Sequence, residues 1–243
     1  MAAVSVLSKS PLCVTVAQNS KFIDAGFAFA AARREAAGPA MKRLGDLVDH
    51  ASASVNPHGK RHTSTLFQYI DLAEVDEVLG TIMSYRELNG AQVGSNKVRF
   101  RHMDVLFAKI RPSIDNKKVA LVYQELENGI ASTEFIVLRA KPEVDAEYIY
   151  AALRSDDFTE AVIRECGGDT GRQRIGPTNL LDIPIPWPDA EQRKDVIEKV
   201  RAYMKSLETT MALRQQAVDL SEEVLGPTSM RTAVPRRKRT KKS

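Results

Sequence analysis

Residues 103–124 read MDVLFAKIRPSIDNKKVALVYQ, which is two apolar runs separated by a polar turn. The runs, 104–110 and 118–124, are rich in Val, Leu, Ile and Phe, and Asp115-Asn116 lies between them, so the pattern predicts two short strands. The intervals between such runs are too short for crossover helices, and a mixed or mostly antiparallel sheet is therefore expected. Further runs of this kind occur at 66–71, 97–100 and 134–139.

On both sides of this strand-rich segment, the sequence has features that are typical of helices. Asp145 is suited to cap a helix in which Tyr148 and Ile149 share one face, and a second short helix fits 156–164. Upstream, 21–47 predicts a helix broken at Gly38-Pro39, and 51–65 predicts an exposed loop.

The last part of the chain predicts one long helix. No Pro or Gly occurs from Asp189 to Leu225, and the acid at 189 with Gln192 forms a plausible capping box. Such a helix is about 54 Å long, longer than a compact domain needs, so it either lies along the globular body or forms a coiled coil with a partner. An apolar stripe with steps of three and four residues comprises Ile197, Val200, Met204, Leu207, Met211, Val218 and Leu225.

The sequence therefore predicts an α+β chain with one β-rich domain, flanking helices and a long C-terminal helix. The expected boundaries are an N-terminal extension (1–19), the β-rich domain (20–188), the helix (189–226) and a basic tail (227–243). Residues 231–243 hold seven of the 35 Lys and Arg and none of the 31 Asp and Glu, which leaves 28 basic against 31 acidic side chains elsewhere. The net charge of +4 thus comes from the tail.

The usual catalytic patterns are missing from the sequence. Its four histidines lack the spacing of a zinc site, and the glycine-rich loop 166–176 lacks the Lys-Ser/Thr ending of a phosphate-binding loop. Two cysteines give no disulfide framework, and no apolar run is long enough to span a membrane. These observations favour a soluble intracellular binding protein over an enzyme.

Several motifs together resemble the target recognition domain of a type I restriction-modification specificity subunit. They are DVLFAKIRP (104–112), NKKV (116–119), STEF (132–135), GRQRI (171–175) and IPIP (183–186), followed by Glu191-Gln192 at the start of the helix. The resemblance covers roughly residues 20–226. A typical specificity subunit has two recognition domains and two spacer helices, whereas this chain has one of each and no internal repeat, so it resembles a half-subunit.

The resemblance implies a non-catalytic subunit that recognises double-stranded DNA within a type I-like adenine methyltransferase or restriction complex. The partner methyltransferase subunits would bind S-adenosylmethionine and perform catalysis, this chain would need no cofactor, and a restriction subunit could join. A homodimer formed through the long helix as a coiled coil would read an interrupted palindrome in a prokaryotic cytoplasm. Two alternatives stay open: a stand-alone DNA-binding defence accessory or regulator, and a scaffold without DNA binding.

The resemblance also gives the local cations a role. Lys109 and Arg111 alternate along a strand and would face DNA, while the competing interpretation is a solvated face with surface ion pairs. Loops 56–65 and 83–96 are expected to carry base-reading residues, and Trp187 to pack between domain and helix. Ser132 could instead cap a turn, and 172–174 could instead contact the methyltransferase. The full predicted DNA-binding set is Lys109, Arg111, Lys117, Lys118, Ser132, Thr133, Arg172, Gln173 and Arg174.

Overall fold

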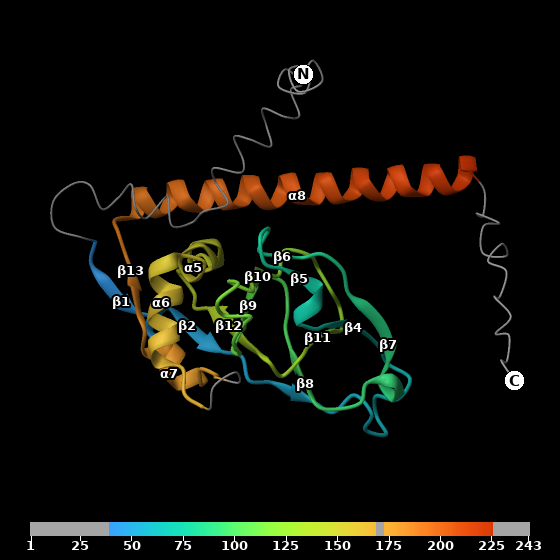
Figure 1. Cartoon of the computed structure of the whole chain (residues 1–243), viewed down its shortest axis with the longest axis horizontal. Helices are drawn as coiled ribbons and strands as arrows, with labels where there is room; N and C mark the ends of the chain where they lie inside the picture. Colours follow the sequence, from blue (N-terminus) through green and yellow to red (C-terminus); the bar gives the residue numbers. More distant parts are fainter. Residues whose placement is uncertain (1–38, 169–172, 226–243) are drawn as a thin grey trace, which may run out of the picture. The chain divides into compact units, whose positions relative to one another are not determined.

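The computed structural model describes residues 39–168 and 173–225, and the chain forms two units divided between Arg201 and Ala202. The first unit is built around two β-sheets (Figure 1). The N-terminal extension, the expected helical residues 21–38 and the basic tail from 226 on lie outside the described residues.

A four-stranded antiparallel sheet forms the centre of the first unit. Its order is β10 (Val119–Leu121), β9 (Asp104–Ala108), β12 (Phe135–Ala140) and β2 (Val48–His50). All five residues of β9 are buried. The apolar runs of the sequence become strands here because both of their faces are covered.

The second sheet has five strands and is mixed. Its order is β3 (Ser54–Val55), β8 (Lys97–Arg99), β11 (Gly129–Ala131), β4 (Leu66–Ile70) and β7 (Arg86–Asn89), and only the β11–β4 pair is parallel. Alternation along β4 sends Ile70 into a core shared with Leu106 and Val137. Phe67 and Tyr69 point to the opposite face, where they pack with Ile130.

Two small strand pairs complete the β structure. β5 (Val75–Asp76) pairs with β6 (Thr81–Ile82), and β1 (Met41–Arg43) pairs with β13 (Pro184–Pro186). Single-turn helices η1 (Leu72–Glu74), η2 (Gly90–Gln92) and α4 (Leu44–Leu47) join neighbouring strands. Within the described part of the expected helix 21–47, only α4 is helical, because β1 pairs with the Ile-Pro segment instead.

Three helices cover this unit. α5 (Ala146–Leu153) is entirely buried, and α6 (Asp156–Glu165) is capped by the Ser155 hydroxyl, which accepts from Phe158 N at 3.2 Å. α7 (Pro177–Asp182) was not expected from the sequence. Asp145 occupies the N-cap of α5 but makes no cap hydrogen bond, since its carboxylate accepts from Arg201 at 3.1 Å.

The long helix α8 (Ala190–Leu225) is present as predicted, with 36 residues. Asp189 caps it by accepting from Gln192 N at 2.9 Å. The first part of α8, up to Arg201, belongs to the β-rich unit. Trp187 packs there as expected, edge-on against Tyr148 at 5.3 Å and under Arg193 at 4.2 Å.

The mixed sheets, flanking helices and long C-terminal helix confirm the predicted α+β fold class. Among the described helices, none is long and apolar enough to cross a membrane.

Candidate nucleic-acid interface

Three of the predicted DNA-binding segments lie side by side in the structure. Directly after β9, the chain runs antiparallel to residues 173–175: Arg111 N donates to Gln173 O at 3.0 Å and Ile175 N donates to Lys109 O at 3.0 Å. On the other side, Lys109 N donates to Glu134 O at 2.9 Å. Residues that are far apart in the sequence therefore form one polar cluster, whose predicted members are Lys109, Arg111, Ser132, Thr133, Gln173 and Arg174.

The base of the glycine-rich loop is closed by backbone hydrogen bonds. Gly167 N donates to Arg174 O at 3.0 Å, and Arg174 N donates to Gly167 O at 2.9 Å. Arg172, a predicted DNA contact, lies outside the described residues. Arg174 also forms an isolated antiparallel β-bridge with Ile110, which connects the base of the loop to the segment that follows β9.

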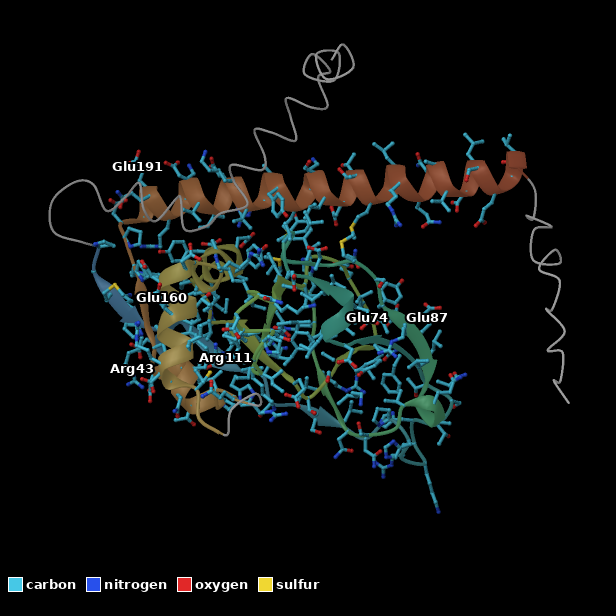
Figure 2. All side chains as sticks on the ribbon, in the orientation of Figure 1. Arg43, Glu74, Glu87, Arg111, Glu160 and Glu191 are labelled. Carbon is cyan, nitrogen blue, oxygen red and sulfur yellow. The ribbon has the colours of Figure 1, made fainter. Side chains whose placement is uncertain are left out.

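Arg111 connects this loop to the turn that follows β9. Its guanidinium donates to both carboxylate oxygens of Asp115 at 2.7–3.1 Å and to Gln173 Oε1 at 2.7 Å. Hydrogen bonding to Arg111 holds the pKa of Asp115 below its usual value, against a smaller upward effect of burial. Figure 2 labels Arg111 toward the α7 end of the β-rich unit. The geometry makes Arg111 a residue that orients Gln173, because its fork is already engaged by protein groups.

The remaining members of the cluster are partly paired. Arg174 forms a half-exposed ion pair with Glu134 at 3.1 Å. Lys109 is half-buried and lies close to His50, whose pKa is lowered by burial and by the Lys109 charge. Ser132 accepts from Glu134 N at 3.4 Å, as in the turn-capping interpretation, whereas Thr133 is exposed.

Lys117 and Lys118 are each engaged by other parts of the protein. Lys118 Nζ donates to Leu72 O at 2.9 Å and Val75 O at 3.1 Å, which fixes η1 and β5. Lys117 forms an ion pair with Asp156 at the start of α6 at 2.5 Å. The side-chain ammonium groups of Lys117 and Lys118 therefore contact different elements, the start of α6 and the η1–β5 segment.

A second polar cluster, around Tyr69, was not predicted. The Tyr69 hydroxyl donates to Asp71 at 2.8 Å, and Arg86 lies 4.6 Å from the Tyr69 ring while pairing with Glu74 at 3.2 Å. Burial, followed by the Asp71 hydrogen bond, raises the pKa of Tyr69 to about 12. Sequence spacing gives no signal for this cluster, because β4, β7 and β8 supply its members through sheet pairing. Lys97 is only 8% exposed, beside the same ring, and burial lowers its pKa.

The predicted stripe of α8 is unevenly exposed. Ile197 and Met204 are buried, Val200, Leu207 and Met211 are half-buried, and Val218 is exposed. The Leu225 side chain lies outside the described residues. A second apolar stripe, which is not predicted from the sequence, lies roughly 130–140° around the helix from the first and comprises Leu213, Ala217, Leu220 and Val224.

Metal chemistry has no candidate centre in the described part of the chain, where no group of three or more His, Cys, Asp or Glu side chains is placed to hold an ion. The fold and the clusters instead define a class of protein: a β-rich domain with polar surface loops, carrying one long helix. No family model matches the chain.

Comparison with known proteins identifies which proteins share this architecture. A segment of 108 residues is 27% identical to the type I restriction enzyme EcoAI specificity subunit of Escherichia coli, covering 43% of this chain and 18% of that protein. The crystal structure of the HsdS subunit from Thermoanaerobacter tengcongensis is 29% identical with a TM-score of 0.59, over 77% of this chain and 47% of that one.

A further solved structure, described as the structural basis of complex assembly and conformational transition of the type I restriction-modification system, is also 29% identical, with a TM-score of 0.58. The match covers 85% of this chain and 52% of that one. The chain therefore spans about half the length of the solved chains it matches. It is similar, in sequence and in fold, to one half of a type I specificity subunit, as its motifs predicted.

Proposed function

We propose that this protein is the sequence-specific DNA-recognition subunit of a type I-like methyltransferase or restriction complex. One observation supports this most strongly: the match to the HsdS structure covers 77% of this chain, with 29% sequence identity and a TM-score of 0.59. Motifs that carry the sequence resemblance also meet in space, since those at 104–112 and 132–135 contact residues 173–175, the described part of the motif 171–175, in the polar cluster after β9.

In this proposal the cluster after β9 is a DNA-contacting surface. Lys109 and Arg174 supply cations for phosphates, and Thr133 supplies an exposed hydroxyl. Arg111 acts as a positioning residue that fixes Gln173, whose amide can pair with an adenine edge in the major groove.

Assembly as a homodimer is part of this proposal, because the sequence matches about half of each solved chain. Two copies supply two recognition domains and two long helices, which a full-length specificity subunit has in a single chain. Dimer symmetry then relates the two half-sites by a twofold axis, so the target is an interrupted palindrome. The methyltransferase subunits bind S-adenosylmethionine and modify adenine, and this chain contributes neither function.

The decisive experiment is a base-resolution adenine-methylation map of the source cell, with and without this gene. We expect one interrupted palindrome to lose its methylation on deletion and to regain it on complementation. A lost motif with unlike halves would keep the recognition function and reject the homodimer. An unchanged map would reject the partnership with a methyltransferase.

A further inference from the structure

Two stretches of the sequence contain cations but no acidic residue. Residues 51–70 and 88–103 hold five Lys and Arg and no Asp or Glu, although the whole chain has 31 acids. The cations are Lys60, Arg61, Lys97, Arg99 and Arg101. A stretch free of acids is electrostatically suited to a polyanion, provided that the fold brings its cations together on an accessible surface.

The fold places these two stretches next to each other. β3 pairs with β8, with Ser54 opposite Val98, and Arg99 N donates to Ala53 O at 2.8 Å. At the end of this strand pair, the loop 56–65 meets the loop 89–96. We call these two loops the loop pair. Glu87, which precedes the second loop on β7, is labelled in Figure 2 far from Arg111, so the loop pair and the cluster after β9 are separate surfaces of the same unit.

Hydrogen bonds and close backbone packing hold the two loops of the loop pair together. The His58 ring bonds Val93 O through Nδ1 at 2.7 Å, and Gly90 N donates to Thr65 O at 3.0 Å. A Cβ on Gly90 would lie 2.0 Å from His62 O and 2.3 Å from Pro57 O. The two backbones therefore pack so closely that only glycine fits between them, and the loops cannot move independently without breaking these contacts.

The accessible side chains of the loop pair are hydrogen-bonding and cationic. Lys60 and Arg61 are exposed on the first loop. Next to the loop pair, on strand β8, Arg99 is half-exposed with its guanidinium 5.8 Å from the Phe67 ring. Lys97 is buried beside Tyr69 and stabilises the base of the surface instead. Four exposed residues of the loop pair carry side-chain amides: Asn56, Asn89, Gln92 and Asn96. Asn89 and Gln92 form the capping box of η2, in which Gln92 Oε1 accepts from Asn89 N at 2.8 Å.

We propose that the loop pair is a second DNA-contacting element, and that it determines which bases are read. Lys60, Arg61 and Arg99 bind phosphates, while the exposed amides of Asn56 and Asn96 face base edges, which amides recognise through paired donor and acceptor groups. Double-stranded DNA is the partner that fits this surface, since its closely spaced phosphates lie beside grooves in which the base edges are accessible. This inference rests on the proposed function and adds the place and the residues of sequence reading.

The first test removes the two exposed loop cations. The full-length chain, with any copurifying subunits retained, is titrated with a fluorescent duplex containing the methylated motif at several salt concentrations. Lys60→Ala/Arg61→Ala should weaken binding at least tenfold at low salt and reduce the slope of log affinity against log salt by about 2. The matched control, Arg164→Ala/Lys194→Ala, removes two cations from exposed helical positions and should leave the slope within about 0.5 of wild type.

The second test separates base reading from charge. Asn56→Ala/Asn96→Ala keeps every charge, so it should lower the preference for the target over a scrambled duplex by about 5- to 150-fold without changing the salt slope. Gly90→Ala should lower the same preference by forcing the two loops apart. Circular dichroism of each variant, matching wild type, establishes that the domain is folded.

The outcomes distinguish this inference from the proposed function. If wild type prefers the target and both loop variants bind like the control, the inference is overturned and the recognition function stands. If wild type shows no preference for any methylated motif, both fail together.

Discussion

At the scale of single residues, the sequence predicts that Arg111 contacts DNA, and the structure shows that its guanidinium already bonds protein groups. The sequence places it beside Lys109 on a strand, which suggests direct contact with DNA. In the structure, its guanidinium donates hydrogen bonds to Asp115 and to Gln173. Gln173 lies 62 positions away in the sequence, so no local pattern encodes this second contact. Its contribution to DNA binding should therefore depend on shape as well as on charge.

Arg111→Lys tests this directly. Lysine keeps the charge but cannot bind both Asp115 oxygens and Gln173 at once, so affinity for the target duplex should fall about as far as in Arg111→Ala, on the order of tenfold. Fluorescence anisotropy measures both variants. A lysine variant that binds like wild type would mean that Arg111 contacts phosphate and does not position Gln173.

Arg154 is a second residue whose function appears only in the folded chain. It is 7% exposed and donates to four backbone carbonyls, those of Glu77, Val78, Lys117 and Val119, at 2.9–3.4 Å. Gly80 makes room for it, since a Cβ there would lie 2.5 Å from the guanidinium. One side chain thus fixes the turn after β5 and the start of β10.

Arg154→Met should destabilise the protein strongly. The substitution leaves several buried carbonyls without a donor, at a cost of about 2–4 kcal/mol, which corresponds to a fall in Tm of roughly 5–15 °C for a chain of this size. Thermal unfolding followed by circular dichroism measures the shift. The exposed Arg164→Met serves as the control, and equal Tm values for the two variants would refute the assignment.

At the scale of elements, the burial of a strand's side chains decides whether the strand can be predicted from the sequence. β4, β9, β10 and β12 follow apolar runs and were predicted because they are buried strands. β7 was missed because its sequence, RELN, is polar and mostly exposed, and it is a strand only through its pairing with β4. Likewise, the cluster after β9 required a bridge between Ile110 and Arg174 that no spacing rule supplies.

The two apolar stripes of α8 differ in how well each is suited to pair with a second copy of the chain. On the predicted stripe, Ile197 and Met204 are already buried, and Arg214 and Ser221 interrupt it. The second stripe follows an unbroken pattern of four-, three- and four-residue steps, and its large members are well exposed: Leu213 59%, Leu220 61% and Val224 72%. We therefore expect the second stripe to be the pairing face of the homodimer.

Leu213→Glu/Leu220→Glu should convert the dimer to a monomer, because it places two charges in the apolar seam. Light scattering coupled to size-exclusion chromatography reports the mass, 26.9 kDa for one copy and twice that for two. Gln215→Glu/Ala212→Glu adds the same charge outside the second stripe and should stay dimeric. Dissociation by Met211→Glu/Val218→Glu alone would assign pairing to the stripe predicted from the sequence.

At the scale of the whole molecule, the proposed homodimer would make α8 a spacer, and both the length of the helix and the angular phase of its apolar stripe would then matter. If two copies pair through the second stripe, residues inserted between Arg201 and Leu213 lengthen the spacer in each copy. Eleven helical residues add about 16 Å per copy, or about 33 Å per dimer, and rotate the stripe by only about 20°. The added length of about 33 Å per dimer is close to one helical turn of B-DNA. The two recognition domains would therefore face the same side of the duplex as they do without the insertion.

An eleven-residue helical insertion after Thr209 should thus preserve methylation and widen the gap of the recognised motif by about ten base pairs, leaving its two halves unchanged. An insertion of seven residues also keeps the stripe in phase, but it adds about 21 Å per dimer and turns the domains by more than half a helical repeat of DNA, so methylation should be lost. The adenine-methylation map of cells that carry each variant reports both results. An unchanged gap with the longer helix would show that α8 does not set the half-site separation, because a spacer cannot grow by a turn of DNA without moving the sites that it holds apart.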